Sequence, residues 1–277
     1  IAAEASYRLI VKTLESLGFR VKLGANIFKD TYGYLASEQE RADDLNRMVA
    51  DGDVKMVLFS GGSGAAEILP LIDYENISRH PKLFSSYSDA TFILSAIYAK
   101  TGLVTYYGLG AGEFRDLRYR EYTQFAAHFF AGNRAESLKG NGEWRVARPG
   151  VCDGVLIGGY AKIFVALLNT EYFRYDPQRK YILFLEAQEK YTGVAGVSAD
   201  LSLIEQNRFI GNVSGLIFGH YSENVPEDLL RRLARFGEKH GVPVVYTDDF
   251  GHGARHSIIP IGVDARLKTD EQTLLFI

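Results

Sequence analysis

The sequence predicts an α/β protein whose N-terminal part is a doubly wound parallel sheet. Two observations predict this class. Apolar strand-like segments, such as 54–59 and 83–86, alternate with helical patterns. No hairpin dipeptide joins one of these strands directly to the next, as it would in an antiparallel meander.

The chain of 277 residues is long enough for one large domain or two ordinary ones. Its 31 basic and 34 acidic residues leave a net charge of −3, and 47% of its residues are hydrophobic. Such a balance gives no global field to attract nucleic acid or an anionic membrane, so we expect neither as a partner. No uncharged apolar run approaches the roughly 18–20 residues that span a bilayer, and no signal peptide precedes the first helical pattern.

The single cysteine, Cys152, excludes a disulfide within the chain and favours a reducing compartment, so we expect a cytoplasmic protein. The thiol could be a nucleophile, but its position just before an apolar strand favours a packing role. The chain has no initiator Met and opens directly in a helical pattern, from which we expect further residues upstream of Ile1.

The N-terminal half opens with apolar residues at helical spacing, among them Tyr7, Ile10 and Leu14, and this first helix should end at Gly18. Ser37 and Glu40 form a capping box that begins a second helix. In order, the elements predicted for this half are a helix over 2–17, a strand over 19–23, a helix starting at 37 with Leu45, Met48 and Val49 on its apolar face, a strand over 54–59, a helix over 65–71, a strand over 83–86 and a helix over 89–100.

A domain junction is expected where residues 131–149 lose periodicity and gain glycine and asparagine. We therefore predict an N-terminal domain over 1–135, a linker over 136–149 and a C-terminal domain over 150–277. The elements predicted for the C-terminal domain are strands over 155–159, 181–185, 213–218 and 242–246, helices over 161–169 and 199–206, a helix from Pro226 to a stop at Gly241, and short apolar segments at 258–263 and 274–277.

The turn Ser60-Gly61-Gly62-Ser63-Gly64 follows one of the predicted strands, where open α/β sheets bind their ligands. Its glycines let backbone N–H groups point at an anion or oxyanion, and Ser63 imitates a nucleophile elbow. No Gly-Lys-Ser/Thr follows, so the turn is not a Walker loop. The alternative is a tight turn that binds nothing.

Ser88 lies between a predicted strand and a predicted helix, where a nucleophile elbow needs small residues two positions before and after the serine. Ser86 and Ala90 meet this requirement. The N–H of Asp89 would then lie at a helix N-terminus and suit a developing oxyanion. The alternative is that Ser88 merely caps the helix.

Two further candidates follow strands of the C-terminal half. Glu186 is the polar end of an apolar strand, and His252 stands between two glycines just beyond another strand. For Glu186 the alternative is a carboxylate turned to solvent or paired with a lysine, and Glu189 is a rival for any acidic role. In the order Ser88, Glu186, His252, these residues would supply a nucleophile, an orienting acid and a base.

Asp248, Asp249 and His256 lie close to His252 in the sequence and raise the question of a metal site. No complete set of ligands at a known metal-binding spacing accompanies them. We therefore expect neither a metal nor another cofactor.

Short motifs along nearly the whole chain point to a known family. They are Asp53-Val54-Lys55, Gly61-Gly62-Ser63-Gly64, Leu69-Pro70-Leu71-Ile72-Asp73-Tyr74, Pro81-Lys82, Tyr87-Ser88-Asp89-Ala90-Thr91, Gly154-Val155-Leu156-Ile157-Gly158-Gly159, Ile182-Leu183-Phe184-Leu185-Glu186, Gly251-His252 and Ile259-Pro260-Ile261-Gly262. In this order and spacing the sequence resembles the LD-carboxypeptidase family of serine peptidases, which includes muramoyltetrapeptide carboxypeptidases and microcin C immunity peptidases.

The resemblance implies Ser88 as the nucleophile, His252 as the general base and Glu186 as the acid that orients it. It removes Ser63 as a nucleophile, because the turn at 61–64 matches the family's Gly-Gly-aromatic-Gly turn. That turn would supply an oxyanion-hole N–H near Gly62, together with the N–H of Asp89.

The same resemblance implies an α/β N-terminal domain that holds the serine and a distinct C-terminal α/β domain that holds the glutamate and histidine. The active site would lie between the two domains, usually in a homodimer. A first strand normally precedes the opening helix in this family.

Several residues depart from the family's usual pattern. Ser86 stands where Gly is common, Tyr160 where Asn is common, Ser60 where Arg is common, and Tyr107 where His is frequent. We expect Ser63, Tyr107 and Tyr160 to contribute to substrate binding, so these departures bear on the choice of substrate.

By resemblance, the expected activity is that of a metal-independent serine carboxypeptidase. Its substrate would be a small murein-derived tetrapeptide, cleaved at the L,D-amide bond to a C-terminal D-amino acid. One alternative is an immunity-type peptidase that cleaves a peptidyl or aminoacyl nucleotide, with Tyr107 or Tyr160 as a platform for the base. Another is a non-catalytic ligand-binding protein with the same fold.

Overall fold

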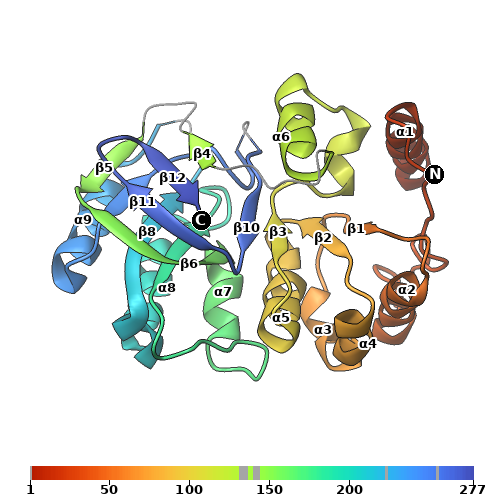
Figure 1. Cartoon of the computed structure of the whole chain (residues 1–277), viewed down its shortest axis with the longest axis horizontal. Coiled ribbons are helices and arrows are strands. Elements are labelled where there is room, and N and C mark those ends of the chain that lie inside the picture. Colours follow the sequence, from red (N-terminus) through yellow and green to blue (C-terminus); the bar gives the residue numbers. More distant parts are fainter. Residues whose placement is uncertain (1, 131–136, 140–143, 222–223, 254–255) are drawn as a thin grey trace.

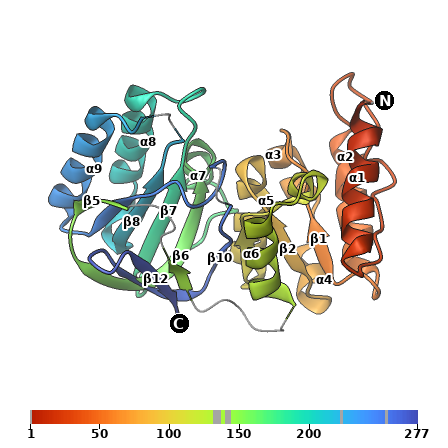
Figure 2. The same ribbon diagram turned by 90° about the horizontal axis from the view of Figure 1, so that it is seen from above.

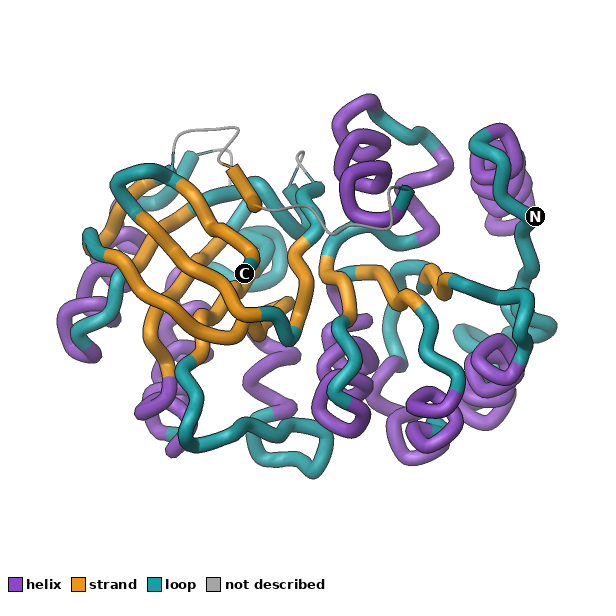
Figure 3. Tube along the Cα trace, in the orientation of Figure 1, coloured by secondary structure: helices purple, strands orange, loops and turns teal. Residues whose placement is uncertain are grey.

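Two β-sheets lie side by side in the computed structural model, each with its own helices (Figure 1). The structure describes residues 2–130, 137–139, 144–221, 224–253 and 256–277. Figure 3 shows the strands as two separate blocks with helices around them. Across these described ranges, no helix has the length and apolar character needed to cross a membrane.

The first sheet has four strands in the order β1-β2-β3-β10. Strands β1 (Met56–Leu58), β2 (Leu83–Ser86) and β3 (Thr105–Tyr107) are parallel, and β10 (Ile259–Ile261) runs antiparallel to β3. Helices α1 (Ala2–Ser16) and α6 (Tyr119–Phe129) lie on one side, and α2 (Glu38–Ala50), α3 (Ala65–Ile68), α4 (Tyr74–Arg79) and α5 (Thr91–Thr101) lie on the other (Figure 1). Helices on both faces confirm the predicted doubly wound architecture.

The second sheet has eight strands in the order β4-β12-β11-β6-β7-β8-β9-β5. Its centre, β6 (Val151–Tyr160), β7 (Tyr181–Glu186), β8 (Val213–Gly219) and β9 (Val244–Tyr246), is parallel. The flanking strands β4 (Ser137–Lys139), β5 (Arg145–Arg148), β11 (Asp264–Lys268) and β12 (Thr273–Phe276) pair antiparallel. Its helices are α7 (Ala161–Leu167), α8 (Val194–Gln206) and α9 (Glu227–His240), and Figure 2 shows α8 beside α9.

Short 3₁₀ helices connect several of these elements. They are η1 (Leu69–Leu71), η2 (Ser88–Ala90), η3 (Ala111–Arg115) and η4 (Arg208–Asn212). The one that matters for the site is η2, because it joins β2 directly to α5.

The two halves share a core at α5. This helix buries Ile93, Leu94 and Ile97, and it contacts β3 of the first sheet as well as β6 and α7 of the second half. A helix that is apolar on most of its surface is buried on several sides, which explains its weak amphipathic pattern. The α5 helix therefore fixes the position of the residues at its N-terminus relative to both sheets.

The chain crosses between the two halves more often than the sequence predicted. The segment expected to be a linker, 136–149, instead contributes β4 and β5 to the second sheet, and β10 from the C-terminal half joins the first sheet. The pairing of β10 with β3 joins residues that are some 150 positions apart, such as Ile259 and Tyr107. Local sequence patterns carry no information on such a pairing.

The predicted strand at 19–23 is not present, since these residues form no β-ladder. Phe19 instead packs its ring against Phe125 and Phe130, with centroids 5.9 and 5.7 Å away. The strand predicted over 54–59 is shortened to three residues. Apolar alternation alone cannot make a strand where no neighbouring strand supplies hydrogen-bond partners.

Cys152 lies within β6, partly buried beneath Gly215. Burial raises the pKa of its thiol to about 12, so the side chain is a protonated, unreactive group at neutral pH. This environment supports the packing role predicted from the sequence.

Candidate active site

Ser88 occupies a strained turn between β2 and α5. Its backbone φ is +61°, in the left-handed region that costs a residue other than glycine about 1–3 kcal/mol. Tyr87 is the N-cap of η2 and Ala90 the N-cap of α5, so Ser88 is not the cap of either helix. Ser86 and Ala90, the small residues two positions away on each side, are both buried. This conformation agrees with an elbow and not with the capping alternative.

A buried acid, Glu186, pairs with the partly buried imidazole of His252. Glu186 ends β7 with no exposed surface, and its Oε2 lies 2.9 Å from Nδ1 of His252. The same carboxylate accepts the backbone N–H of His252 at 3.0 Å. The two contacts fix the orientation of the imidazole ring and leave Nε2 as the nitrogen that faces away from the acid.

A glycine is required beside this pair. Gly251 has φ +69°, and a Cβ at this position would lie 2.2 Å from Cδ of Glu186. The backbone of the loop after β9 can therefore approach the carboxylate only because no side chain stands between them. The glycine before His252 thus has a steric explanation in the structure.

Tyr107 joins this pair to the elbow. Its hydroxyl donates to Oε1 of Glu186 and accepts the backbone N–H of Ser88 at 3.0 Å. The three residues expected to act together, Ser88, Glu186 and His252, therefore lie in one hydrogen-bonded cluster. Tyr107 has no exposed surface, so its observed contacts are with the groups of this cluster. Its expected part in substrate binding stays a prediction.

Aromatic rings surround the imidazole of His252. The ring of Tyr87 packs edge to face at a centroid distance of 4.9 Å, and that of Tyr160 does so at 5.5 Å. Tyr221, which has an unusual φ of +48°, lies 6.4 Å away. Tyr160 is only partly buried and so remains a candidate for contact with a ligand. Tyr87 and Tyr221 could not be identified from the sequence, because nothing in their local pattern marks them.

The glycine-rich turn is tied to the elbow through Asp89. The carboxylate of Asp89 accepts the N–H of Ala65 at 2.8 Å, and Arg41 donates to the carbonyl oxygen of Gly64 at 2.7 Å. Burial raises the pKa of Asp89. Gly62 and Ser63 are exposed at the tip of the turn. The turn is thus anchored at its end nearest α3, while its proposed oxyanion donor at Gly62 faces the surface.

Thr91 links the two domains at the site. Its hydroxyl donates to the carbonyl oxygen of Ser88 at 2.6 Å and accepts the N–H of Tyr160 at 3.0 Å. A Cβ on Gly159 would lie 2.6 Å from this side chain, so the strand end and the elbow are in close contact. Sequence reasoning missed Thr91, although its place three residues after Ser88 brings it to the same face of the turn.

The remaining acidic and histidine candidates have structural partners. Asp248 accepts the N–H groups of His220 and Tyr221, each at 3.1 Å. His256 lies 3.9 Å from Glu121, and burial lowers the pKa of its imidazole.

Asp249 accepts the indole N–H of Trp144 at 3.2 Å, and Glu189 is exposed. No group of three or more His, Cys, Asp or Glu side chains suited to a metal ion occurs in the described part of the chain.

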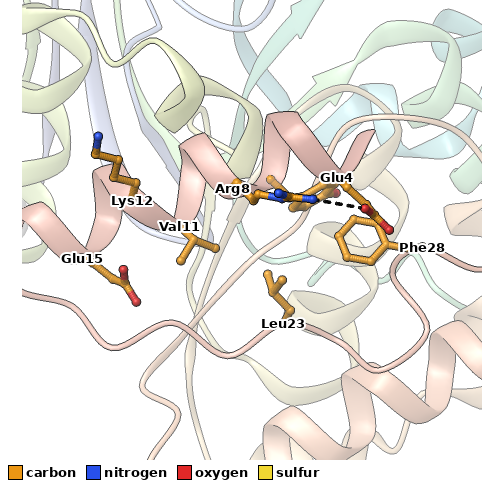
Figure 4. Close-up of a pocket in the computed structure, with 8 residues that line it drawn as sticks. Glu4, Arg8, Val11, Lys12, Glu15, Leu23 and Phe28 are labelled. Carbon is orange, nitrogen blue, oxygen red and sulfur yellow. Dashed lines mark ion pairs between the residues drawn. The ribbon is translucent and has the colours of Figure 1, made fainter. Parts of the chain in front are cut away.

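A groove of about 440 Å³ lies along α1, away from this cluster (Figure 4). Val11, Leu23 and Phe28 line it, with an ion pair between Arg8 and Glu4 at its rim. None of the candidate site residues borders it.

Comparison with known proteins identifies the family. Models of the LD-carboxypeptidase N-terminal domain and C-terminal domain match residues 1–108 and 153–267. The chain is 31% identical over 276 residues to a probable murein peptide carboxypeptidase from Bacillus subtilis, covering 94% of this chain and 83% of that protein.

Solved structures agree with this match. An MccF-like protein from Bacillus anthracis has a TM-score of 0.84 at 27% identity, with 98% of this chain and 91% of that chain covered. MccF in complex with glutamyl sulfamoyl guanosine shares the fold, with a TM-score of 0.85 at 22% identity over 100% and 91% of the two chains. The chain belongs to the LD-carboxypeptidase family of serine peptidases.

Proposed function

We propose that this protein is a serine carboxypeptidase that uses Ser88, His252 and Glu186 to hydrolyse the L,D-amide bond to a C-terminal D-amino acid in murein-derived tetrapeptides. The observation that carries the proposal is the pair of Glu186 and His252, which is hydrogen-bonded through Tyr107 to the backbone of the strained elbow at Ser88. Acyl transfer of this kind requires a nucleophile, a base and an orienting acid.

In the first half of the reaction, Oγ of Ser88 attacks the scissile carbonyl carbon and His252 takes the hydroxyl proton at Nε2. Glu186 stabilises the imidazolium through Nδ1, where the two groups lie 2.9 Å apart. The N–H groups of Gly62 and Asp89 are the proposed donors to the oxyanion. When the intermediate collapses, the amide C–N bond breaks, and His252 gives its proton to the leaving amine of the D-amino acid.

In the second half, water enters the place of the departed amine. His252 removes a proton from this water, which attacks the acyl-enzyme carbonyl and forms a C–O bond. The ester bond to Ser88 then breaks, and the proton returns to Oγ. The products are a tripeptide carboxylate and a free D-amino acid, and the enzyme is restored.

The choice of substrate rests on the similarity to the protein named probable murein peptide carboxypeptidase in Bacillus subtilis. It is tested with tetrapeptides that differ only in the configuration of the residue before the scissile bond. We expect cleavage of the L,D-peptide and at least a hundredfold lower kcat/KM on the D,D-peptide. Equal rates on the two would contradict the proposed specificity.

A second candidate is cleavage of an aminoacyl or peptidyl nucleotide. The observation in its favour is the partly exposed ring of Tyr160 beside His252, because a nucleobase can stack on such a ring. The solved MccF complex with glutamyl sulfamoyl guanosine shows that a protein of this fold binds such a ligand. Inhibition of tetrapeptide hydrolysis by an aminoacyl sulfamoyl adenosine at micromolar concentration would favour this candidate, and no inhibition at millimolar concentration would exclude it.

A further inference from the structure

Tyr107 is the only described side chain that hydrogen-bonds both to the backbone of Ser88 and to the carboxylate of Glu186. The two partners come from different domains, since Ser88 follows β2 and Glu186 ends β7. We propose that Tyr107 is a positioning residue that sets both the elbow and the acid–imidazole pair for catalysis. This inference rests on the proposed function of Ser88, Glu186 and His252.

The surroundings of Tyr107 favour the arrangement in which its hydroxyl donates to Glu186. The side chain is fully buried, and its ring packs against Phe184 of β7 at a centroid distance of 5.6 Å. Burial, with the nearby charge of Glu186, raises the pKa of the phenol well above its ordinary value. The phenol is therefore neutral at working pH and must direct its single proton to the carboxylate, so its oxygen lone pair is free to accept from Ser88.

The carboxylate of Glu186 needs this donor. It is fully buried, and a buried charge is tolerated only when hydrogen bonds replace its lost hydration. Oε2 receives the backbone N–H of His252 and lies 2.9 Å from Nδ1, while Oε1 receives Tyr107 and lies 3.1 Å from Nδ1. Tyr107 thus holds the carboxylate in the rotation that turns both oxygens to the imidazole, and it withdraws part of the negative charge from the carboxylate.

The second hydrogen bond acts on the nucleophile. Because the N–H of Ser88 points at Tyr107, the backbone of the elbow is held in its left-handed conformation from below. The side chain of Ser88 is then directed away from the sheet, as an elbow requires. One hydroxyl therefore fixes the relative positions of groups that must meet in the transition state.

The test is Tyr107→Phe, which keeps the ring and removes only the hydroxyl. Loss of a hydrogen bond to a charged group should lower kcat about tenfold to hundredfold. We expect little change in KM, because the buried side chain does not face the substrate. Tyr106→Phe is the matched control, since Tyr106 precedes Tyr107 in β3 and packs against Phe129, outside the cluster.

The pH profile separates this role from a merely structural one. Without the donor, the carboxylate attracts the protonated imidazole of His252 more strongly, so the acidic limb of kcat/KM should move to higher pH by about one unit. Replacing Tyr107 with 3-fluorotyrosine, a stronger donor of almost equal size, should move the limb the opposite way. This second variant keeps the inference testable if Tyr107→Phe fails to fold.

The outcomes distinguish the inference from the function on which it rests. If the wild-type protein hydrolyses none of the peptides or nucleotides tested, the proposed function fails and the inference fails with it. If the wild-type protein is active but the Tyr107 variants keep its kcat and acidic limb, only the inference is overturned. A lower melting temperature with an unmoved acidic limb would also overturn it, since that is the signature of a structural role.

Discussion

Glu186 holds His252 by two different groups, the backbone N–H at 3.0 Å and the ring Nδ1 at 2.9 Å. The backbone contact sets the position of the loop after β9, and the ring contact sets the tautomer and orientation of the imidazole. A single carboxylate therefore specifies both where the proposed base lies and which of its nitrogens is available.

Replacing this acid by its amide should abolish most of the activity. The amide of Glu186→Gln can donate its N–H to Nδ1 and so stabilise the wrong tautomer, which should lower kcat by about 10³-fold or more. The measurement is steady-state hydrolysis of the tetrapeptide. Glu189→Gln, the same change three residues away on an exposed side chain, should retain wild-type kcat. Similar losses in both variants would show that the pair at Glu186 has no special role.

A side chain at Gly251 should damage both stability and activity. Gly251→Ala forces alanine into φ +69° and places a Cβ 2.2 Å from Cδ of Glu186. We expect a loss of about 2 kcal/mol or more in the free energy of unfolding and at least a hundredfold lower kcat. Denaturant unfolding and hydrolysis rates measure the two effects. Gly211→Ala, with nothing within 4 Å of its Cβ, is the control, and an equally small effect at both glycines would refute the steric argument.

The hydroxyl of Thr91 should contribute strongly to the free energy of unfolding. Thr91→Val preserves the shape of a fully buried side chain but removes the acceptor for the N–H of Tyr160 and the donor to Ser88. A buried N–H left without a partner costs about 1–3 kcal/mol. Thr123→Val, which removes a hydroxyl bonded only within α6, should cost much less. If the unfolding curves of the two variants superimposed, Thr91 would not be a link between the domains.

Acid should weaken the start of α2. Hydrogen bonds from Thr31, Ser37 and Lys29 lower the pKa of Glu40 from 4.5 to about 2. A lowered pKa in the folded state adds stability that is fully present above pH 4.5 and is lost as the pH falls toward about 2. The melting temperature of the wild type should therefore exceed that of Glu40→Gln at pH 7. This difference in melting temperature should be smaller at pH 2.5. A difference that stays constant over this range would contradict the assignment.

Three residues of the candidate site could be singled out because strand ends can be recognised in the sequence. Glu186 stands out as the polar end of the apolar run 182–185, and His252 as a histidine between two glycines with no packing role. Ser88 stands out through its small neighbours, Ser86 and Ala90. Each of these signals is local, and each marks a residue at or just beyond the carboxyl end of a parallel strand in one of the two sheets.

The rest depends on contacts between distant segments. Tyr107 looks like any apolar strand residue in the sequence, and only the approach of β7 to β3 shows that its hydroxyl meets Glu186. Strands β4 and β10 pair with strands more than a hundred residues away in the sequence. Strand β5 pairs with β9, about a hundred residues away. Conversely, the apolar pattern at 19–23 predicted a strand, but no strand in the described part of the chain pairs with these residues.

The identity of the nucleophile is tested most directly by labelling with a fluorophosphonate, followed by mass spectrometry of the proteolysed protein. We expect one labelled peptide, modified at Ser88, with tetrapeptide hydrolysis lost in proportion to labelling. We also expect Ser88→Ala to remain unlabelled and to lose activity by several orders of magnitude. Labelling at another serine, or hydrolysis by Ser88→Ala at the wild-type rate, would contradict the central claim.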